Sequence, residues 1–334
     1  MQTLWVGGNG GMEAGLVERA GIPFKSIPAS GVHGVGLRAL PGNLAQLARG
    51  VAASRRILGE FKPDVLFFTG GYVAVPMAAA AGRRIPSVLY VPDIEPGLAL
   101  KTLGRLARRI AVTARESNAF FARPERITVT GYPVRADLAG WDRASARQAL
   151  QLSADLPVVL VTGGSKGART LNNPVLEHLP ELLELAQVVH ITGELDWDDI
   201  RSRTAGLERH ERYHAYPYLH EQMGAALAAA DLAIARAGAS TLGEFPLFGL
   251  PAILVPYPYA WRYQKVNADY LTSRGAALMI ANEDLSTRLL PAVQALLQDP
   301  GRLAAMRSAM QSLSHPQAAE AIGALLTGLA EKRS

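Results

Sequence analysis

The chain has 334 residues, of which 49% are hydrophobic and 19% charged, so a disordered chain is excluded and two globular domains are expected. It contains no cysteine, which excludes disulfides, thiol catalysis and cysteine-ligated zinc. The formal net charge of +5 is uneven, because residues 1–134 hold 16 Lys and Arg against 8 Asp and Glu, and the remaining residues hold 18 against 21. A basic first half favours contact with nucleic acid or with anionic lipid head groups.

The apolar stretches of the sequence are short. The longest uncharged ones, such as GGYVAVPMAAAAG at residues 70–82, run to about a dozen residues and contain proline, whereas crossing a bilayer takes about 20. The first residues also lack the basic segment, apolar run and small-residue cleavage site of a secretory signal. We therefore expect neither a spanning helix nor a secretory signal.

Apolar runs alternate with helical periodicity in the first half, a pattern typical of parallel sheets covered by helices. A long helix is predicted where Leu44, Leu47, Val51 and Leu58 recur at helical spacing. The predicted strands of this half are residues 3–6, 64–68, 87–91, 109–113 and 127–131.

The second half restarts the same rhythm after a predicted linker at residues 131–150, which has proline, glycine and charge but no strand pattern. Helices are expected at residues 285–300 and in two further segments before the C-terminus. The predicted strands are residues 157–165, 187–193, 232–238 and 252–258. In doubly wound sheets of this kind, the ligand lies at the carboxyl ends of the strands.

The strongest candidate site is VVLVTGGSKGARTLN at residues 158–172. A buried-type strand leads into Gly163-Gly164-Ser165, and a helix is expected from near Gly167. Glycines let the backbone approach a phosphate, and a helix N-terminus offers free N–H groups. The spacing does not match a P-loop, and a tight turn without a ligand is the alternative interpretation.

The second candidate follows the strand that ends in Arg236-Ala237-Gly238-Ala239. A helix is predicted to start at Ser240-Thr241 and to carry Glu244 one turn later. Glu244 could complete a capping box with Thr241, or it could accept two hydrogen bonds from a ribose, as carboxylates do at the strand ends of such sheets.

The third candidate is weaker on its own. Gln264 and Asn267 are three residues apart at a predicted helix start, so they share one face, and paired amides suit sugar hydroxyls. The seven histidines show no metal-ligand spacing; His210 and His214 are four apart, but in a segment that does not have a helical pattern.

The opening GGNGGMEAGLV resembles a dinucleotide-binding loop, which leaves a dinucleotide oxidoreductase as one alternative. However, Glu13 stands where that pattern needs a small residue, and no acidic residue between Glu18 and Glu60 could hold a ribose. We therefore expect this loop to be a poor phosphate site.

Taken together, GGNGGMEAGLV, PDVLFFTGGYVAVP, GYPVR, GGSKGARTLN, RAGASTLGE and YQKVNA resemble the inverting family 28 glycosyltransferases, in particular the N-acetylglucosaminyltransferases of peptidoglycan synthesis. The resemblance covers essentially the whole chain. It implies an α/β fold of GT-B type, with two Rossmann-like doubly wound domains facing across a cleft. Residues 1–134 would form the acceptor and membrane-side domain, with a C-terminal helix at 316–334 packing back on it, and residues 135–315 would bind the UDP-sugar.

The resemblance implies UDP-N-acetylglucosamine as donor substrate, with no cofactor and no metal. It places Arg135 near the phosphates, Glu244 on the ribose, Gln264 and Asn267 on the sugar hydroxyls, and Leu219 or His220 beside the uracil. The remaining donor-binding positions that it implies are Gly164, Ser165, Gly238, Ala239, Ser240, Thr241, Leu242 and Gly243.

On the acceptor side, the resemblance implies a polyprenyl-diphosphate lipid carrying a muramyl peptide, approached by Gly70, Gly71, Tyr72 and Asp93. Relatives carry His-Glu-Gln-Asn where this chain has Tyr90-Val91-Pro92-Asp93, so Asp93 is the candidate catalytic base. Lys166 replaces a usual glutamine, and Trp261 and Tyr263 replace more polar residues. The relatives also begin with an additional strand and glycine loop, so we expect a natural chain longer by about 30 residues.

A lipid acceptor implies a peripheral protein on the cytoplasmic face of the membrane that does not bind nucleic acid. Residues 34–61 and 98–110 mix leucines with arginines and suit head-group contact, although an amphipathic helix packed on a sheet would look the same. Two alternatives stay open: a related family 28 enzyme that acts on another lipid such as diacylglycerol, and a nucleotide-sugar-binding protein without catalysis.

Overall fold

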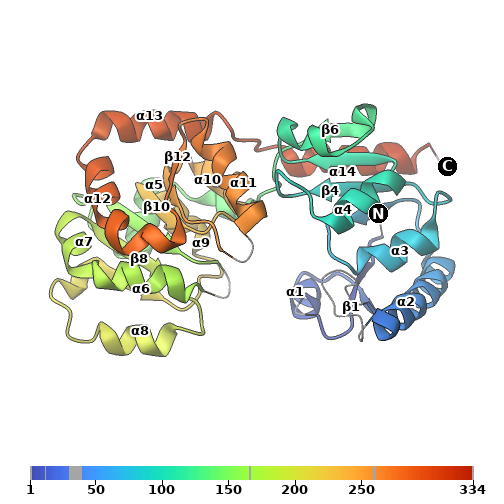
Figure 1. Cartoon of the computed structure of the whole chain (residues 1–334), viewed down its shortest axis with the longest axis horizontal. Helices are drawn as coiled ribbons and strands as arrows, with labels where there is room; N and C mark the ends of the chain where they lie inside the picture. Colours follow the sequence, from blue (N-terminus) through green and yellow to red (C-terminus); the bar gives the residue numbers. More distant parts are fainter. Residues whose placement is uncertain (1, 12, 30–39, 165–166, 259–260, 333–334) are drawn as a thin grey trace. The chain divides into compact units, whose positions relative to one another are not determined.

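The computed structural model describes residues 2–11, 13–29, 40–164, 167–258 and 261–332 (Figure 1). By its internal packing the chain forms two compact units. Unit 1 comprises Met1–Pro92, Pro96–Val129 and Glu320–Ser334, and unit 2 comprises Asp93–Glu95 and Thr130–Ala319. Each unit is a parallel sheet structure with its own apolar core.

Unit 2 contains one six-stranded parallel sheet with the order β12-β11-β10-β7-β8-β9. This is the doubly wound order 3-2-1-4-5-6 read from the other edge, so β7 and β10 are the two central neighbours at which the winding reverses. Its strands are β7 (Val158–Thr162), β8 (Gln187–Ile191), β9 (Tyr213–Tyr216), β10 (Leu232–Ala235), β11 (Ala252–Leu254) and β12 (Ala277–Met279).

Helices cover both faces of this sheet (Figure 1). On one face, leucines and valines of α6 (Arg169–Glu177), α7 (Leu179–Leu185) and α12 (Leu285–Leu297) form a core with the strand side chains. On the other face, α5 (Arg143–Ala149) packs with α9 (Met223–Ala229), which contacts β7. The remaining helices of the unit are α8 (Trp197–Arg203), α10 (Glu244–Phe248), α11 (Trp261–Thr272) and α13 (Pro300–Gln311).

Unit 1 has two parallel sheets among its described residues, β1-β2 and β3-β4-β5-β6. Among the described residues, β1 pairs only with β2, and β3 pairs only with β4. The elements are β1 (Trp5–Gly8), β2 (Phe24–Ile27), β3 (Leu66–Phe68), β4 (Ser87–Val91), β5 (Arg109–Val112), β6 (Ile127–Val129), α1 (Ala14–Arg19), α2 (Leu40–Phe61), α3 (Ala74–Ala81), α4 (Leu98–Leu106) and α14 (Ala318–Ala330).

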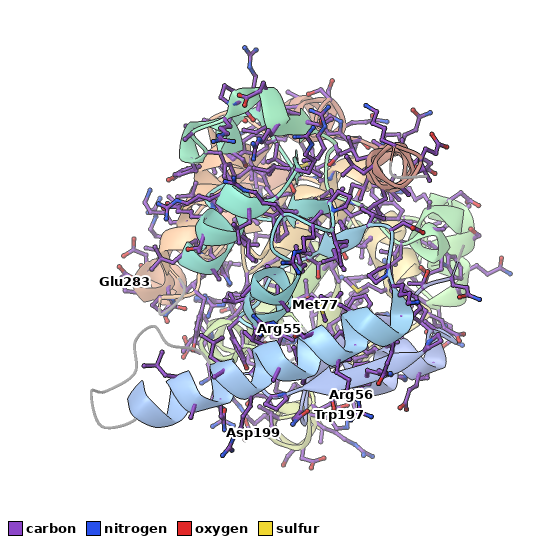
Figure 2. All side chains as sticks on the ribbon, turned by 90° about the vertical axis from the view of Figure 1, so that its right-hand side faces the viewer. Arg55, Arg56, Met77, Trp197, Asp199 and Glu283 are labelled. Atoms are coloured by element: carbon purple, nitrogen blue, oxygen red, sulfur yellow. The ribbon has the colours of Figure 1, made fainter. Side chains whose placement is uncertain are left out.

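The predicted long helix of the first half is confirmed as α2, which packs on α3 (Figure 2). Gly50 allows a close approach, because a Cβ there would lie 2.2 Å from the carbonyl oxygen of Pro28 and 3.2 Å from the Pro76 side chain on α3. Buried residues of α2 are Gly50, Ser54 and Ile57, whereas Leu44 is 51% exposed. The expected apolar face of the helix is therefore only partly used for packing inside unit 1.

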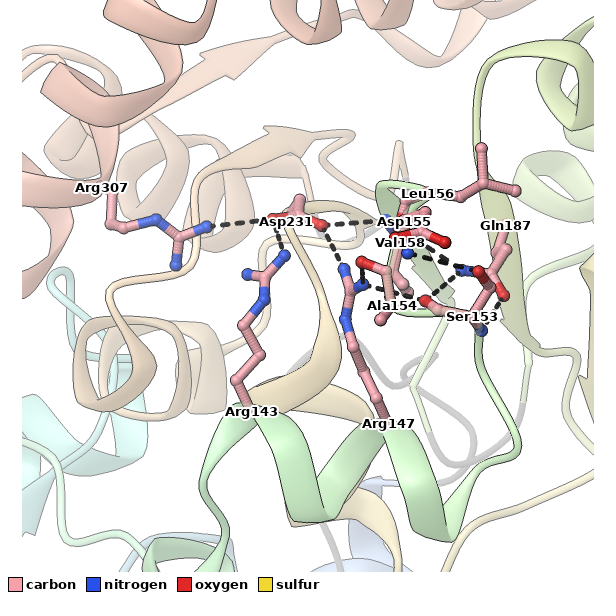
Figure 3. Close-up of polar contacts among 10 residues, drawn as sticks. All are labelled: Arg143, Arg147, Ser153, Ala154, Asp155, Leu156, Val158, Gln187, Asp231 and Arg307. Atoms are coloured by element: carbon pink, nitrogen blue, oxygen red, sulfur yellow. Dashed lines mark hydrogen bonds and ion pairs between the residues drawn. The ribbon is translucent and has the colours of Figure 1, made fainter.

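One charged network joins four elements at the amino end of the sheet in unit 2 (Figure 3). Asp231 directly precedes β10 and accepts a hydrogen bond from the Val158 N–H at 3.0 Å. The same carboxylate pairs with Arg143 at 2.5 Å and Arg147 at 3.0 Å on α5, and with Arg307 at 3.6 Å on α13. Asp231 thus fixes two helices to the starts of the two central strands.

All nine predicted strands are present, while β2, β9 and β12 were not predicted as strands. The predicted linker at 131–150 has no strand, as expected, but it contains the helical segments η3 (Ala136–Gly140) and α5, which were not predicted. The helix α5 begins with Asp142, whose carboxylate accepts from the N–H groups of Ala144 and Ser145. This N-cap was the available sequence signal for it.

Candidate active site

The doubly wound order brings the carboxyl ends of β7 and β10 side by side, and the two strongest sequence motifs follow these two strands. After β7 come Gly163, Gly164 and Gly167; Ser165 and Lys166 lie outside the described residues. Gly167 has φ +74°, and a Cβ there would lie 2.4 Å from the carbonyl oxygen of Thr192. Only glycine fits this turn. The helix that follows, α6, has no side-chain cap among the described residues, and an uncapped helix start favours an anion.

Arg236, at the end of β10, is a buried cation beside this turn. Its guanidinium donates to the Val255 carbonyl oxygen at 3.1 Å and to the hydroxyl of Thr170 on α6, and it lies 5.5 Å from the centre of the Tyr257 ring. Burial lowers the pKa of Arg236 to about 10. Arg236 therefore ties the end of β10 to β11 and to the helix behind the glycine turn.

The segment after β10 carries the candidate ribose carboxylate. The prediction of a helix from Ser240 is wrong in detail, because η5 (Ala239–Leu242) is a single 3-10 turn and α10 begins at Glu244. The Thr241 hydroxyl donates back to the Gly238 carbonyl oxygen at 2.7 Å, so it does not form the capping box. Burial raises the pKa of Glu244, while the charge of Arg135 and a hydrogen bond with Ser240 lower it.

Tyr132 is a site residue that the sequence reasoning missed. Its ring packs against Gly243, where a Cβ would lie 2.6 Å from a ring carbon. Its pKa is raised to about 12, first by burial and then by the charges of Glu244 and Asp93. Tyr132 therefore lies close enough to both carboxyl groups for their charges to act on it. Nothing in the local sequence GYPVR marked this tyrosine, because its contact with Gly243 is a tertiary one.

Asp93 packs with unit 2 and is held by Asn267 of α11. The Asn267 amide nitrogen donates to Asp93 Oδ1 at 2.8 Å and to the Ala237 carbonyl oxygen at 3.1 Å. Burial raises the pKa of Asp93, and the Asn267 hydrogen bond lowers it. The candidate base therefore lies at the end of β10, close to Tyr132.

The other predicted site residues lie in three places: on α11, in the segment after β9, and before α3. Gln264 lies on α11, and its side-chain oxygen accepts from the Tyr257 N–H at 2.8 Å. Leu219 is buried, and His220 is exposed with its ring against Tyr218. In unit 1, Gly70 and Gly71 have positive φ before α3, and Tyr72 is 53% exposed. The Trp261 side chain lies outside the described part.

The opening glycine loop holds a carboxylate of its own. Glu13 Oε1 accepts from the Gly8 N–H at 3.0 Å, and a Cβ on Gly11 would lie 2.1 Å from Glu13 Oε2. The loop N–H that could bind a phosphate is thus already paired with Glu13. This agrees with the expectation that the opening loop is a poor phosphate site.

Within the described residues, no group of three or more His, Cys, Asp or Glu side chains is arranged to hold a metal ion. In the same part of the chain, no helix has both the length and the apolar character needed to cross a bilayer.

Comparison with known proteins identifies the family. Residues 1–112 match the glycosyltransferase family 28 N-terminal domain, and residues 158–322 match the glycosyltransferase family 28 C-terminal domain. A relative from Roseiflexus sp. (strain RS-1), a UDP-N-acetylglucosamine--N-acetylmuramyl-(pentapeptide) pyrophosphoryl-undecaprenol N-acetylglucosamine transferase, is 39% identical over 99% of this chain and 84% of its own length. The chain belongs to glycosyltransferase family 28.

Further matches agree with this membership of family 28. A relative with the same name from Desulforudis audaxviator (strain MP104C) is 40% identical over 98% of this chain and 90% of its own length. The crystal structure of MurG from Acinetobacter baumannii superimposes with a TM-score of 0.75 and 26% identity, covering 98% of this chain and 91% of that one. The predicted family, the glycosyltransferase class and the fold of two Rossmann-like α/β domains are confirmed.

A more distant structure shares the fold of this family 28 enzyme. The UDP-GlcNAc 2-epimerase from Neisseria meningitidis, bound to UDP-GlcNAc, superimposes with a TM-score of 0.67 at 13% identity, over 98% of this chain and all of that one. At this identity the likeness concerns the architecture alone.

Proposed function

We propose that this family 28 glycosyltransferase moves N-acetylglucosamine from UDP-N-acetylglucosamine to a polyprenyl-diphosphate lipid that carries a muramyl peptide, a step of peptidoglycan and cell wall synthesis. The observation that carries the proposal is that the glycine turn before α6 and the segment that leads to Glu244 follow β7 and β10, the neighbouring strands at the switch point of the sheet. The relatives at 39% and 40% identity are named for this transfer.

The donor site has a part for each portion of a nucleotide sugar. The uncapped start of α6, with Gly164 and Ser165 before it, suits the diphosphate, because free N–H groups and the helix dipole stabilise negative charge. Arg135 adds a positive charge within reach of Glu244. The Glu244 carboxylate accepts the ribose hydroxyls, and Gln264 contacts the sugar from α11. The η5 turn lines the nucleotide, with Leu219 and His220 beside the base.

The reaction needs a base for the acceptor hydroxyl and stabilisation of the UDP that leaves. Asp93 serves as the base, because its carboxylate lies at the carboxyl end of β10 and burial raises its pKa, which makes the carboxylate a stronger base. The start of α6 and Arg135 stabilise the developing charge on the diphosphate. In this scheme the enzyme uses no metal and no cofactor.

A lipid acceptor requires contact with a membrane, and unit 1 offers a suitable surface. By helical spacing Leu44 and Arg55 lie about three turns apart on the same face of α2, and both are exposed. On α4, Leu98 and Leu106 are exposed near Arg105. Apolar side chains among arginines suit an anionic leaflet. We place the enzyme peripherally on the cytoplasmic face, where UDP-sugars are available, with no role for nucleic acid.

The test is a transfer assay with labelled UDP-N-acetylglucosamine and two acceptors, the polyprenyl-diphospho-muramoylpentapeptide and diacylglycerol, in mixed micelles. The proposal predicts label in the muramyl-peptide lipid and none in diacylglycerol. Label in diacylglycerol alone would assign the enzyme to another lipid acceptor. UDP-N-acetylglucosamine binding without transfer to either lipid would contradict the proposal.

A further inference from the structure

A buried carboxylate near the glycine turn of unit 2 has no part in the proposed reaction. Asp196 directly precedes α8, and its side chain is 8% exposed. Aspartate at this position usually caps its helix, because its oxygens accept from the first free N–H groups. In the part of the chain that the structure describes, no side chain caps α8, so the Asp196 carboxylate has another task.

Both oxygens of Asp196 bind the first turn of α6, the helix that lies beside α8 (Figure 1). Arg169, the first residue of α6, donates from Nε to Asp196 Oδ1 at 2.8 Å, and its Nη2 lies 2.8 Å from the same oxygen. Asn172 Nδ2 donates to Asp196 Oδ2 at 3.0 Å. One carboxylate therefore holds two positions of α6 that are one turn apart.

Asn172 also links this turn of α6 to the end of β8. Its second amide hydrogen goes to the Thr192 carbonyl oxygen at 2.9 Å, and a hydrogen bond of 3.1 Å joins its oxygen to His190 Nε2. The glycine turn packs against the same Thr192 carbonyl group, where Gly167 leaves no room for a Cβ. The segment from Thr192 to Asp196 is therefore the surface against which the glycine turn and the start of α6 pack.

We propose that Asp196 is a positioning residue for the donor diphosphate, which fixes the first turn of α6 in the orientation that presents its N–H groups to the phosphates. A side-chain cap at the start of α6 would occupy these N–H groups, whereas an anchor beside the neighbouring helix leaves them open. The inference rests on the proposed function in one respect, namely that the start of α6 binds the diphosphate.

The charge of Asp196 and its contacts have opposite effects on an anion at the start of α6. A carboxylate near a diphosphate weakens anion binding by repulsion, although the positive charge of Arg169 offsets this. If charge alone decided, removal of the Asp196 carboxylate would strengthen the binding of UDP. If positioning decides, the same change weakens it. The sign of the change in UDP affinity therefore separates the two effects.

The first experiment compares wild type with Asp196→Ala. The dissociation constant for UDP, measured by calorimetric titration, should rise about tenfold, as expected when one hydrogen bond to a charged group is lost. Uridine lacks the diphosphate, so its dissociation constant from an NMR titration should stay at the wild-type value. The Asn172 N–H donates to the Ala168 carbonyl oxygen at 2.8 Å, and its hydrogen exchange should accelerate in the variant.

Asp199→Ala is the matched control. Asp199 lies on α8 and pairs with Arg203 at 3.5 Å, and Arg203 donates to Asn173 Oδ1 on α6 at 3.0 Å. This ion pair joins the same two helices, but the Asp199 side chain is 61% exposed. The control variant should keep the wild-type affinity for UDP and the wild-type exchange of Asn172.

Asp196→Asn separates position from charge. The amide removes the negative charge and keeps one acceptor oxygen for Arg169 or Asn172. UDP should therefore bind this variant less tightly than wild type and more tightly than Asp196→Ala. Tighter binding of UDP than in wild type would show that Asp196 acts by charge alone, which contradicts the proposal.

Two results with Asp196→Ala would overturn the proposal: UDP affinity at or above the wild-type value, or equal losses of affinity for UDP and uridine, which indicate a general loss of structure. If Asp196→Ala does not fold, Asp196→Asn provides the same comparison of UDP with uridine. If wild type binds no UDP, the proposed donor site fails, and the exchange of Asn172 still decides whether Asp196 holds the start of α6.

Discussion

Glu244 combines burial with a positive neighbour, and this combination makes its donor contact dependent on pH. Burial raises its pKa above the ordinary value, and Arg135 and Ser240 counteract part of that rise. Accepting two ribose hydroxyls requires the carboxylate form. Donor affinity should therefore be constant above the raised pKa and fall as the pH drops through it, by up to about tenfold per unit.

Glu244→Gln removes this titration. We expect the dissociation constant for UDP-N-acetylglucosamine to rise about tenfold to 100-fold, since hydrogen bonds to a charged group contribute about 1.5–3 kcal/mol. Calorimetric titrations at several pH values measure both effects. The exposed Glu283 on the same unit provides a control, and Glu283→Gln should bind donor like wild type. Equal pH dependence in Glu244→Gln and wild type would rule out this role.

Residues of the candidate site differ in how far sequence could predict them. The glycine turn directly follows β7, and the segment that leads to Glu244 follows β10, so the sequence could predict both near the neighbouring ends of these parallel strands. Asp93 and Asn267 are 174 positions apart, and their contact leaves no periodic trace in the sequence. The ring of Tyr132 against Gly243 is also a tertiary contact, so neither its burial nor its role had a local signal.

At the scale of elements, one carboxylate organises the amino end of the sheet in unit 2. Asp231 joins α5 and α13 to the starts of β7 and β10 (Figure 3). Because Arg147 is only 9% exposed, removal of Asp231 leaves a buried cation without its partner.

Asp231→Ala should lower the free energy of unfolding by about 3 kcal/mol, as expected when one partner of a buried ion pair is removed. Denaturant unfolding followed by tryptophan fluorescence measures the change. Asp199→Ala removes an exposed carboxylate that pairs with Arg203 and should cost less than about 1 kcal/mol. A similar decrease in the free energy of unfolding in the two variants would show that the Asp231 network does not stabilise unit 2 more than a surface ion pair does.

Hydrogen bonds of His190 connect α6 to β8 and β9. Its ring nitrogens lie 3.1 Å from Asn172 Oδ1 and 2.9 Å from the Tyr213 hydroxyl. Because the Asn172 oxygen can only accept, Nε2 carries the proton and Nδ1 accepts from the tyrosine. Complete burial lowers the pKa of His190 to about 3, so the neutral ring is the native form.

This histidine should make the stability of unit 2 depend on pH. The unfolded chain binds a proton near the ordinary pKa of about 6.5, whereas the folded chain does not until the pH is near 3. As the pH drops from about 6.5 to about 3, the free energy of unfolding should therefore fall by up to about 1.4 kcal/mol per pH unit. Chemical denaturation at several pH values in this range measures how the free energy of unfolding changes with pH. This pH dependence should be smaller in His190→Gln and equal to wild type in a variant of the exposed His210. Identical pH dependence in all three proteins would contradict this.

The elements themselves were mostly predictable, and the exceptions have physical causes. The strands β2, β9 and β12 are short and contain Lys25, His214 and half-buried residues, so they lack a buried apolar run. The helix α5 was missed because proline, glycine and charge in the preceding residues dominated its composition, although Asp142 marked its start.

At the scale of the whole molecule, the basic charge is concentrated in the half that we propose to contact the membrane. Two neighbouring arginines of α2, Arg55 and Arg56, allow a controlled test of this contact (Figure 2). Arg56 bonds to Glu60 at 2.8 Å, whereas Arg55 shares the face of the exposed Leu44.

Arg55→Gln should weaken binding to anionic vesicles about fivefold, because each basic residue near the leaflet contributes about 1 kcal/mol. Arg56→Gln should have a smaller effect, since Glu60 already offsets that charge. Co-sedimentation with phosphatidylglycerol vesicles at two salt concentrations measures both, and wild-type binding should fall with salt. If binding is indifferent to salt and to both variants, the α2 surface is not the contact.

The most direct measurement is the balance of products when purified enzyme, UDP-N-acetylglucosamine and polyprenyl-diphospho-muramoylpentapeptide react in micelles. We predict one UDP released for each lipid glycosylated, with the new glycosidic bond in the β configuration because transfer inverts the α-linked donor. UDP release without glycosylated lipid, or a retained α configuration, would contradict the central claim.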